Sequence, residues 1–157
     1  EVQRLRGFLL VLVHRVVVFL DRIPLVDRDD EPLRLVGSWT AEGVEFPRFA
    51  EATRQLDAQG ELALPARVWK TGRSSWIEDY SADPRYPRAE AAGADGLGGG
   101  TAFPVRIGSQ FVAVMEFFGR EVRAPDPELI ALTDALGVLV GEFIESLRIA
   151  EAVRATL

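Results

Sequence analysis

The sequence contains no cysteine and one histidine, and these two scarcities limit the chemistry it can perform. Without cysteine there is no disulfide scaffold, no thiol nucleophile, no thiolate zinc site and no thioether-linked chromophore. No Ser-His-Asp set can be built around His14, which we interpret as a partly exposed helix residue rather than an axial haem ligand. The sequence therefore predicts neither an enzyme nor a bound metal or cofactor.

Clustered basic charge and long hydrophobic runs are also missing. The net charge is −6 and the pI is about 4.9, with basic residues interleaved among acids. This pattern argues against a nucleic-acid interface, because counterion release requires clustered Lys and Arg. Residues 7–20 are strongly apolar, but His14 and Arg15 divide them into pieces shorter than the roughly 20 residues of a membrane-spanning helix. We therefore expect one cytoplasmic domain of 157 residues with no nucleic-acid or membrane partner.

Apolar residues at helical spacing mark both ends of the chain. Residues 1–20 are predicted to be a helix, although the β-branched run at 16–19 is also typical of a strand. A second helix is predicted over 126–157, where Asp126 caps the first turn and Pro127 takes its first position. Its near-heptad apolar stripe carries no stop signal and leaves one face for a second subunit. The dimerisation candidates on the two helices are Leu5, Leu9, Leu12, Leu132, Leu136, Leu139, Phe143 and Leu147.

Between these helices, residues 22–120 are predicted to form a sheet core with its connecting helices and loops. The predicted elements are strands at 21–27 and 33–39 paired as a hairpin, helices at 47–59 and 65–71, a short strand from 76, a helical turn at 88–92, and strands at 101–107 and 110–118. Pro24 implies an edge position or a bulge, and Gly72 suits the left-handed end of a helix. Both faces of 110–118 are apolar, which predicts a central strand with helices on each side and hence an α+β fold.

Several segments together resemble a bacterial GAF domain, of the type found in sensor histidine kinases and diguanylate cyclases. They are LPARVW at 64–69, WIED at 76–79, SADPRYPR at 81–88, TAFPV at 101–105 and MEFF at 115–118. The resemblance covers about residues 22–147. It implies a central antiparallel sheet of five or six strands, terminal helices on one face, and a pocket on the other face closed by the helices and loop between Pro47 and Gly100. It also implies dimerisation through the terminal helices.

The same resemblance removes the best-known ligands of that family. The bilin-binding and methionine-sulfoxide-reducing members depend on cysteine, which is absent here. The Asn-Lys-Phe-Asp-Glu set of the cyclic-nucleotide-binding members cannot be assembled. Ala63 and Ala66 stand where family members commonly carry glycine beside the Leu-Pro pair. The small molecule expected in the pocket therefore remains unidentified.

Candidate ligand-binding residues are aromatic or charged side chains near the predicted pocket. They are Trp39, Trp76, Tyr80, Arg85, Tyr86, Phe103 and Glu116, although aromatic residues also fill cores. Glu116 lies in an apolar strand, so it is either buried and paired or on a solvent-facing side; Arg85 and Arg106 are the candidate partners. Glu78, Asp79 and Asp83 fit a strand end and turns better than a metal site.

We therefore predict a non-catalytic sensory domain of a bacterial signal-transduction protein, such as a two-component histidine kinase. It would bind a small ligand and relay a change through its C-terminal helix to an effector domain downstream. The alternative is a structural homodimerisation module whose pocket is filled by Trp76, Tyr80 and Phe103. An enzyme is the weakest hypothesis, because no nucleophile–base pair is present.

Overall fold

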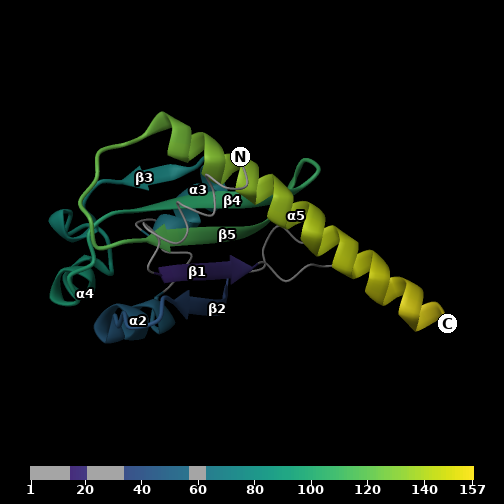
Figure 1. The fold of residues 1–157 in the computed structure, drawn as a ribbon, viewed down its shortest axis with the longest axis horizontal. Coiled ribbons are helices and arrows are strands. Elements are labelled where there is room, and N and C mark those ends of the chain that lie inside the picture. Colours follow the sequence, from purple (N-terminus) through teal and green to yellow (C-terminus); the bar gives the residue numbers. More distant parts are fainter. Residues whose placement is uncertain (1–14, 21–33, 57–62) are drawn as a thin grey trace.

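A computed structural model describes residues 15–20, 34–56 and 63–157 (Figure 1). The elements in chain order are β1 (Arg15–Leu20), β2 (Arg34–Thr40), α2 (Pro47–Arg54), α3 (Leu64–Thr71), β3 (Ser75–Ile77), the 3-10 turn η1 (Tyr80–Ala82), α4 (Ala89–Ala94), β4 (Gly100–Ile107), β5 (Gln110–Phe118) and α5 (Pro127–Thr156).

The described strands form one antiparallel sheet in the order β2-β1-β5-β4-β3. The predicted hairpin of β4 and β5 is confirmed, and Gly108 in its two-residue turn has a positive φ of 62°. The central position of β5 is also confirmed, since β5 pairs with β1 on one side and with β4 on the other. The chain is therefore α+β, with its sheet built around β5.

The prediction of a helix through residues 15–20 is wrong. This segment is strand β1, and it pairs along its whole length with both β2 and β5. Three consecutive valines followed by phenylalanine favour a strand, and pairing on two sides outweighs their helical spacing. The partner of β2 is thus β1 rather than residues 21–27. Those residues lie outside the described ranges, as do His14, Pro24 and the dimerisation candidates Leu5, Leu9 and Leu12.

Helix α5 begins as predicted and covers one face of the sheet. The Asp126 carboxylate accepts hydrogen bonds from the backbone N–H groups of Glu128 and Leu129, and Pro127 takes the first helical position. The C-terminal half of α5 projects beyond the sheet (Figure 1). Within the described ranges, no helix combines the length and the hydropathy that crossing a membrane requires.

Two glycines bring α5 unusually close to β4. Gly137 and Gly141 are buried, and a Cβ atom added at either one would overlap a backbone carbonyl of β4, at Pro104 or Arg106 respectively. Only a residue without a side chain fits at such a contact. Two small apolar clusters complete the packing between α5 and the sheet. One contains Phe103 and the other contains Val105.

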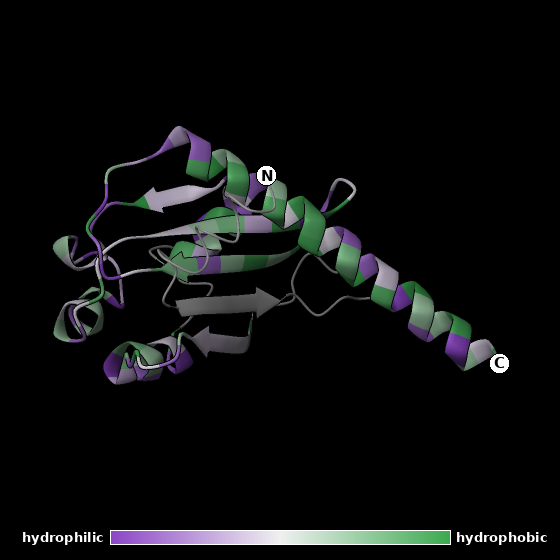
Figure 2. Cartoon of the chain, in the orientation of Figure 1, coloured by the Kyte–Doolittle hydropathy of each residue, from purple (hydrophilic) through white to green (hydrophobic). Residues whose placement is uncertain are grey.

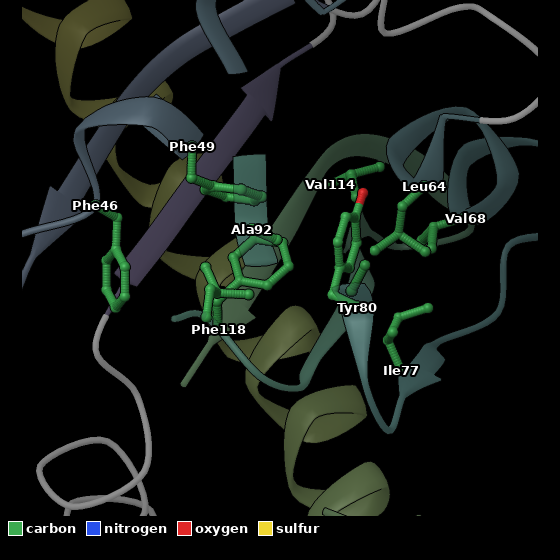
Figure 3. Packing of buried hydrophobic residues seen from close by; sticks show 11 residues of the cluster. Phe46, Phe49, Leu64, Val68, Ile77, Tyr80, Ala92, Val114 and Phe118 are labelled. Carbon is green, nitrogen blue, oxygen red and sulfur yellow. The ribbon is translucent and has the colours of Figure 1, made fainter. Parts of the chain in front are cut away.

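The opposite face of the sheet is covered by α2, α3, η1 and α4. Its core cluster is larger, and Figure 3 shows how its side chains gather on this face. The buried members are Phe46, Phe49, Leu64, Val68, Ile77, Tyr80, Ala92, Leu97, Ala102, Val114 and Phe118. Burial on both faces explains why β5 is predominantly hydrophobic (Figure 2).

Gly141→Ala should destabilise the fold by about 3 kcal/mol, because the new methyl group must push α5 away from β4. Ordinary helix propensity predicts the opposite, a gain of about 1 kcal/mol. Urea unfolding followed by circular dichroism measures the difference. The matched control is Gly93→Ala in α4, where the nearest neighbour of a new Cβ is the exposed Ser81 Cβ at 3.2 Å. Equal effects of the two substitutions would contradict the close contact.

Candidate functional site

A buried ion pair lies between the sheet and its covering helices, on the face away from α5. Glu116 accepts two hydrogen bonds from the Arg88 guanidinium, at 2.6 Å from Nη2 to Oε1 and at 3.0 Å from Nη1 to Oε2. The exposed fraction is 1% for the Arg88 side chain and 0% for that of Glu116. Of the two alternatives for Glu116, the structure therefore selects the buried and paired one.

The partner of Glu116 is Arg88, and both partners suggested by the sequence are wrong. Arg85 is exposed and forms an ion pair with Asp83, 2.8 Å from Nη2 to Oδ2. Arg106 donates a hydrogen bond to the carbonyl of Gly72 at 3.0 Å. Hairpin register favoured Arg106, but the cation comes from the helical layer above the sheet.

Arg88 and Glu116 are positioned by very different elements. Glu116 lies in the central strand β5, opposite Ala102 of β4, whose small side chain leaves room for the carboxylate and guanidinium. Arg88 is the N-cap residue of α4, with no side-chain capping bond of its own. The sequence did contain one signal for this pair, since Arg88 opens the helical turn that was predicted at 88–92 in the covering layer.

Three aromatic rings surround the Arg88 guanidinium, and we call them the aromatic cage: Phe49, Tyr80 and Phe118. The guanidinium carbon lies 4.9 Å, 5.6 Å and 5.5 Å from their respective centroids. The rings come from α2, η1 and β5, and Figure 3 shows them within one cluster. Such contacts attract a cation through the negative faces of the rings. Neither Phe49 nor Phe118 was among the sequence-predicted site residues.

Only some of the polar atoms in this centre have hydrogen-bond partners. Thr53 Oγ1 accepts a third bond from Arg88 Nη1 at 3.3 Å. Within the described part of the chain, Arg88 Nε and the Tyr80 hydroxyl are buried with no hydrogen-bond partner. Leaving a buried donor unpaired costs free energy. The centre thus contains two polar groups that the surrounding protein leaves unsatisfied.

Burial and charge set the protonation states of the centre. Burial raises the pKa of Tyr80 to about 12, against an opposing effect of the Arg88 charge. Burial is the largest single effect on Arg88 and would by itself lower its pKa, but the charge and hydrogen bonds of Glu116 act together with Tyr80 to keep this pKa above its ordinary value. Near neutral pH the centre therefore holds a cationic guanidinium beside an un-ionised phenol.

Tyr86 connects this centre with the surface. Its ring stacks on that of Tyr80, with centroids 4.9 Å apart and an interplanar angle of 25°. Its hydroxyl accepts a hydrogen bond of 2.9 Å from Nη1 of the exposed Arg67 in α3. Tyr86 itself is partly exposed. It therefore lies between solvent and the aromatic cage.

The structure brings together Tyr80, Tyr86 and Glu116 from the predicted ligand-binding set. The other members lie elsewhere: Phe103 packs against Phe117 under α5, and Arg85 is exposed. Trp76 pairs in register with Thr101, and its Nε1 donates to the carbonyl of Arg123 at 2.8 Å. Trp39, in β2 at the edge of the described sheet, is 54% exposed.

The acidic residues near η1 have structural partners. Asp79 accepts hydrogen bonds from the backbone N–H and the hydroxyl of Ser81, and Asp83 is paired with Arg85. No group of three or more potential metal ligands exists among the residues that the structure describes. These contacts support the turn interpretation of both aspartates.

Two hydrogen bonds link the segments on either side of β3 to α5 and to the chain that leads into it. The Ser74 hydroxyl, just after α3, is hydrogen-bonded to the Asp134 carboxylate of α5. The backbone N–H of Arg123 donates to the carbonyl of Glu78 at 3.2 Å in the segment leading into α5. A groove of about 550 Å³ lies beside the first contact, between α5 and the turn from α3 to β3. These contacts join the turn after α3 to α5, and the end of β3 to the segment that leads into α5.

Comparison with known proteins gives a consistent family and fold. The family model described as "GAF domain" matches residues 7–145. No curated protein matches the sequence.

Solved structures of similar fold include GAF domains of signalling proteins and an enzyme. The GAF domain of a two-component sensor histidine kinase from Bacillus halodurans has a TM-score of 0.61 at 15% identity, covering 96% of this chain and 95% of that one. The GAF domain/HD domain protein from Geobacter sulfurreducens has a TM-score of 0.62 at 14% identity, covering 94% and 88%. Free methionine-R-sulfoxide reductase from Neisseria meningitidis, solved with its substrate, has a TM-score of 0.58 at 13% identity, covering 88% and 71%. At these identities the likeness shows the fold.

Removing either member of the ion pair should cost roughly 3–5 kcal/mol, because the remaining charge is buried without compensation. We expect this loss for Arg88→Met and for Glu116→Leu, measured by urea unfolding. The double variant should lose far less than the sum of the single losses. Arg85→Met, which removes an exposed pair, serves as the control and should leave the unfolding free energy nearly unchanged. Additive single losses would contradict a direct coupling.

Tyr80 should make the protein less stable in alkali. Its pKa is about 12 when folded against 10.0 for an unperturbed tyrosine, so between these values the unfolded state loses the proton first and stability falls as pH rises. The full effect is roughly 3 kcal/mol. Tyr80→Phe should be almost neutral at pH 7, since no described group bonds the hydroxyl, and should remove this part of the alkaline loss. Urea midpoints from pH 9 to 12 test it; an equally steep decline in the variant would count against it.

Proposed function

The chain belongs to the GAF domain family, and from this premise we propose that it is a non-catalytic sensory domain of a bacterial signal-transduction protein. In this proposal a small molecule binds between the sheet and the layer formed by α2, α3 and α4. Binding shifts α5, which passes the change to an effector domain in the same cytoplasmic protein.

The observation that carries this proposal is the buried centre of Arg88 and Glu116. Apolar side chains of similar volume would fill a core at equal or lower free energy, so a buried ion pair is a poor device for stability alone. The centre also holds an unpaired Arg88 Nε and an unpaired Tyr80 hydroxyl, whose pKa is strongly raised. Groups of this kind concentrate at functional sites.

A route for the relay is supported by the contacts of α5. α3 covers the centre, and the turn after it holds α5 through Ser74 and Asp134. The segment before α5 is bonded to β3 through Trp76 and Arg123. A displacement of α3 would thus reach α5 through the turn that holds Ser74, and a shift of β3 would reach it through Arg123. Packed elements connected in this way shift between discrete arrangements rather than deform continuously.

The second candidate is a structural homodimerisation module without a ligand. It is favoured by the tight packing of the aromatic cage, in which Phe49 and Phe118 lie 4.9 Å apart edge to face and Tyr80 is fully buried. Of its predicted fillers Trp76, Tyr80 and Phe103, only Tyr80 occupies this space. Both candidates share the proposed homodimer, for which α5 offers an exposed apolar surface.

A metabolite panel separates the two candidates. A sensory domain should give at least one compound that raises the melting temperature saturably, and the same compound should change hydrogen exchange along α5. The response should be lost in Glu116→Gln and kept in the exposed control Glu78→Gln. If no compound changes the melting temperature of the wild-type protein, the ligand-binding proposal is refuted and the structural module is favoured.

The exposed surface of α5 should mediate the dimer. Leu139, Phe143 and Leu147 are 55%, 63% and 49% exposed and lie on one stripe of the helix. Burying such side chains against a second copy would stabilise the dimer by removing apolar surface from water. Leu139→Glu with Phe143→Glu should therefore reduce the mass measured by light scattering from twice 17.3 kDa to one copy. Glu142→Gln, an exposed position outside this stripe, is the control; an unchanged mass in the double variant would refute this interface.

A further inference from the structure

We propose that the aromatic cage and Glu116 form a receptor for a small guanidinium or amidinium cation, whose place Arg88 takes when no such cation is bound. The inference rests on the proposed sensory function and names the ligand class of the same site. Arg88 would then act as an internal competitor, and its release would be the first step of the response.

The fixed part of the site selects a cation. Glu116 places a carboxylate in the central strand, with an exposed fraction of 0%. Phe49, Tyr80 and Phe118 present their rings to the same position, within 5.6 Å of the present guanidinium carbon. A buried carboxylate among aromatic faces favours a positive group and repels a negative one.

The geometry of the hydrogen bonds narrows the cation further. The two oxygens of Glu116 accept from two different nitrogens, at 2.6 Å and 3.0 Å. Two parallel N–H groups on a planar fork are the property of guanidinium and amidinium groups, whereas an ammonium acts as a point charge. The site therefore matches the planar, two-nitrogen geometry of a guanidinium or amidinium group as well as its positive charge.

Arg88 fits this receptor incompletely and is the more movable partner. Its Nε is buried without a partner among the described residues, which costs free energy that an amidinium, having no third nitrogen, avoids. Glu116 is held in a strand paired on both sides, while Arg88 precedes a helix of only six residues. An anionic ligand would have to displace Glu116 from the central strand. A cationic ligand has only to displace Arg88.

The surroundings of α4 allow such an exchange. The far end of α4 is anchored, because the Asp95 carboxylate accepts a hydrogen bond of 2.7 Å from the backbone N–H of Phe49 in α2. The near end carries Arg88 and follows the segment of Tyr86, which separates the cage from solvent. Movement of Tyr86 would open a path to the cage, and Arg88 would leave with the first turn of α4.

Titration of the full chain with methylguanidinium and with acetamidinium tests the proposal, using calorimetry and melting temperature. We expect saturable binding of both cations and none of acetate, with methylammonium weaker than either. Glu116→Gln should abolish binding, and Glu78→Gln should leave it unchanged. Arg88→Ala should bind methylguanidinium roughly tenfold or more tightly, because the tethered competitor is gone.

Three results would overturn the inference: no saturable binding by the wild-type protein, binding that survives Glu116→Gln, or an affinity for methylguanidinium that Arg88→Ala fails to raise. If Arg88→Ala does not fold alone, refolding with methylguanidinium decides: recovery of the native circular dichroism supports the site, and no recovery rejects it. If neither cation binds but a neutral or anionic panel compound does, and its binding is lost in Glu116→Gln, the cation receptor is overturned and the sensory proposal still stands.

Discussion

The fold is organised around a negative charge that lies in its central strand. Glu116 is fully buried in β5, and a carboxylate there requires a cation, which its register partner Ala102 in β4 does not provide. Arg88 supplies this cation from 28 residues earlier in the chain. The requirement fixes where α4 begins, and it draws α2 and η1 inward because their rings pack around the guanidinium. Much of the covering layer is thus placed by one electrostatic constraint.

The two faces of the sheet solve the packing problem in opposite ways. Under α5 the contact is apolar and so close that Gly137 and Gly141 meet backbone carbonyls of β4. On the other face, side chains of several elements enclose a charged centre that keeps unpaired polar atoms. One face is therefore rigid and closely fitted, whereas the other has groups that a ligand can satisfy. This division of roles suits a domain that binds on one face and transmits through the other.

Local signals were sufficient for those elements whose ends are encoded nearby. The hairpin of β4 and β5, the left-handed end of α3 at Gly72, and the cap of α5 at Asp126 all follow from turn and capping chemistry. Segment 15–20 was misassigned because its strand state depends on pairing with β5, about a hundred residues later in the chain. The β-branched run at 16–19 indicates a strand, but no local pattern identifies β5 as its partner.

The candidate site was only partly predictable for a related reason. Glu116 was recognised because a lone charge interrupts an apolar strand, but its partner belongs to a layer whose position the sequence does not specify. Trp76 and Phe103 were assigned to the pocket although register places them on the side of α5, opposite Thr101 and Met115. A displacement of one residue changes the face on which a strand residue lies, so aromatic character alone cannot place it.

The glycine contact between α5 and β4 restricts the kind of motion that α5 can make. Rotation about the helix axis would replace Gly137 or Gly141 by a neighbour with a side chain, such as Val138 or Val140, and drive it into the β4 carbonyls. Tilting about the two glycines keeps both of them against the carbonyls of β4. The contact therefore allows α5 to tilt more easily than to rotate. We expect a signal carried by this helix to be a tilt rather than a rotation about its axis.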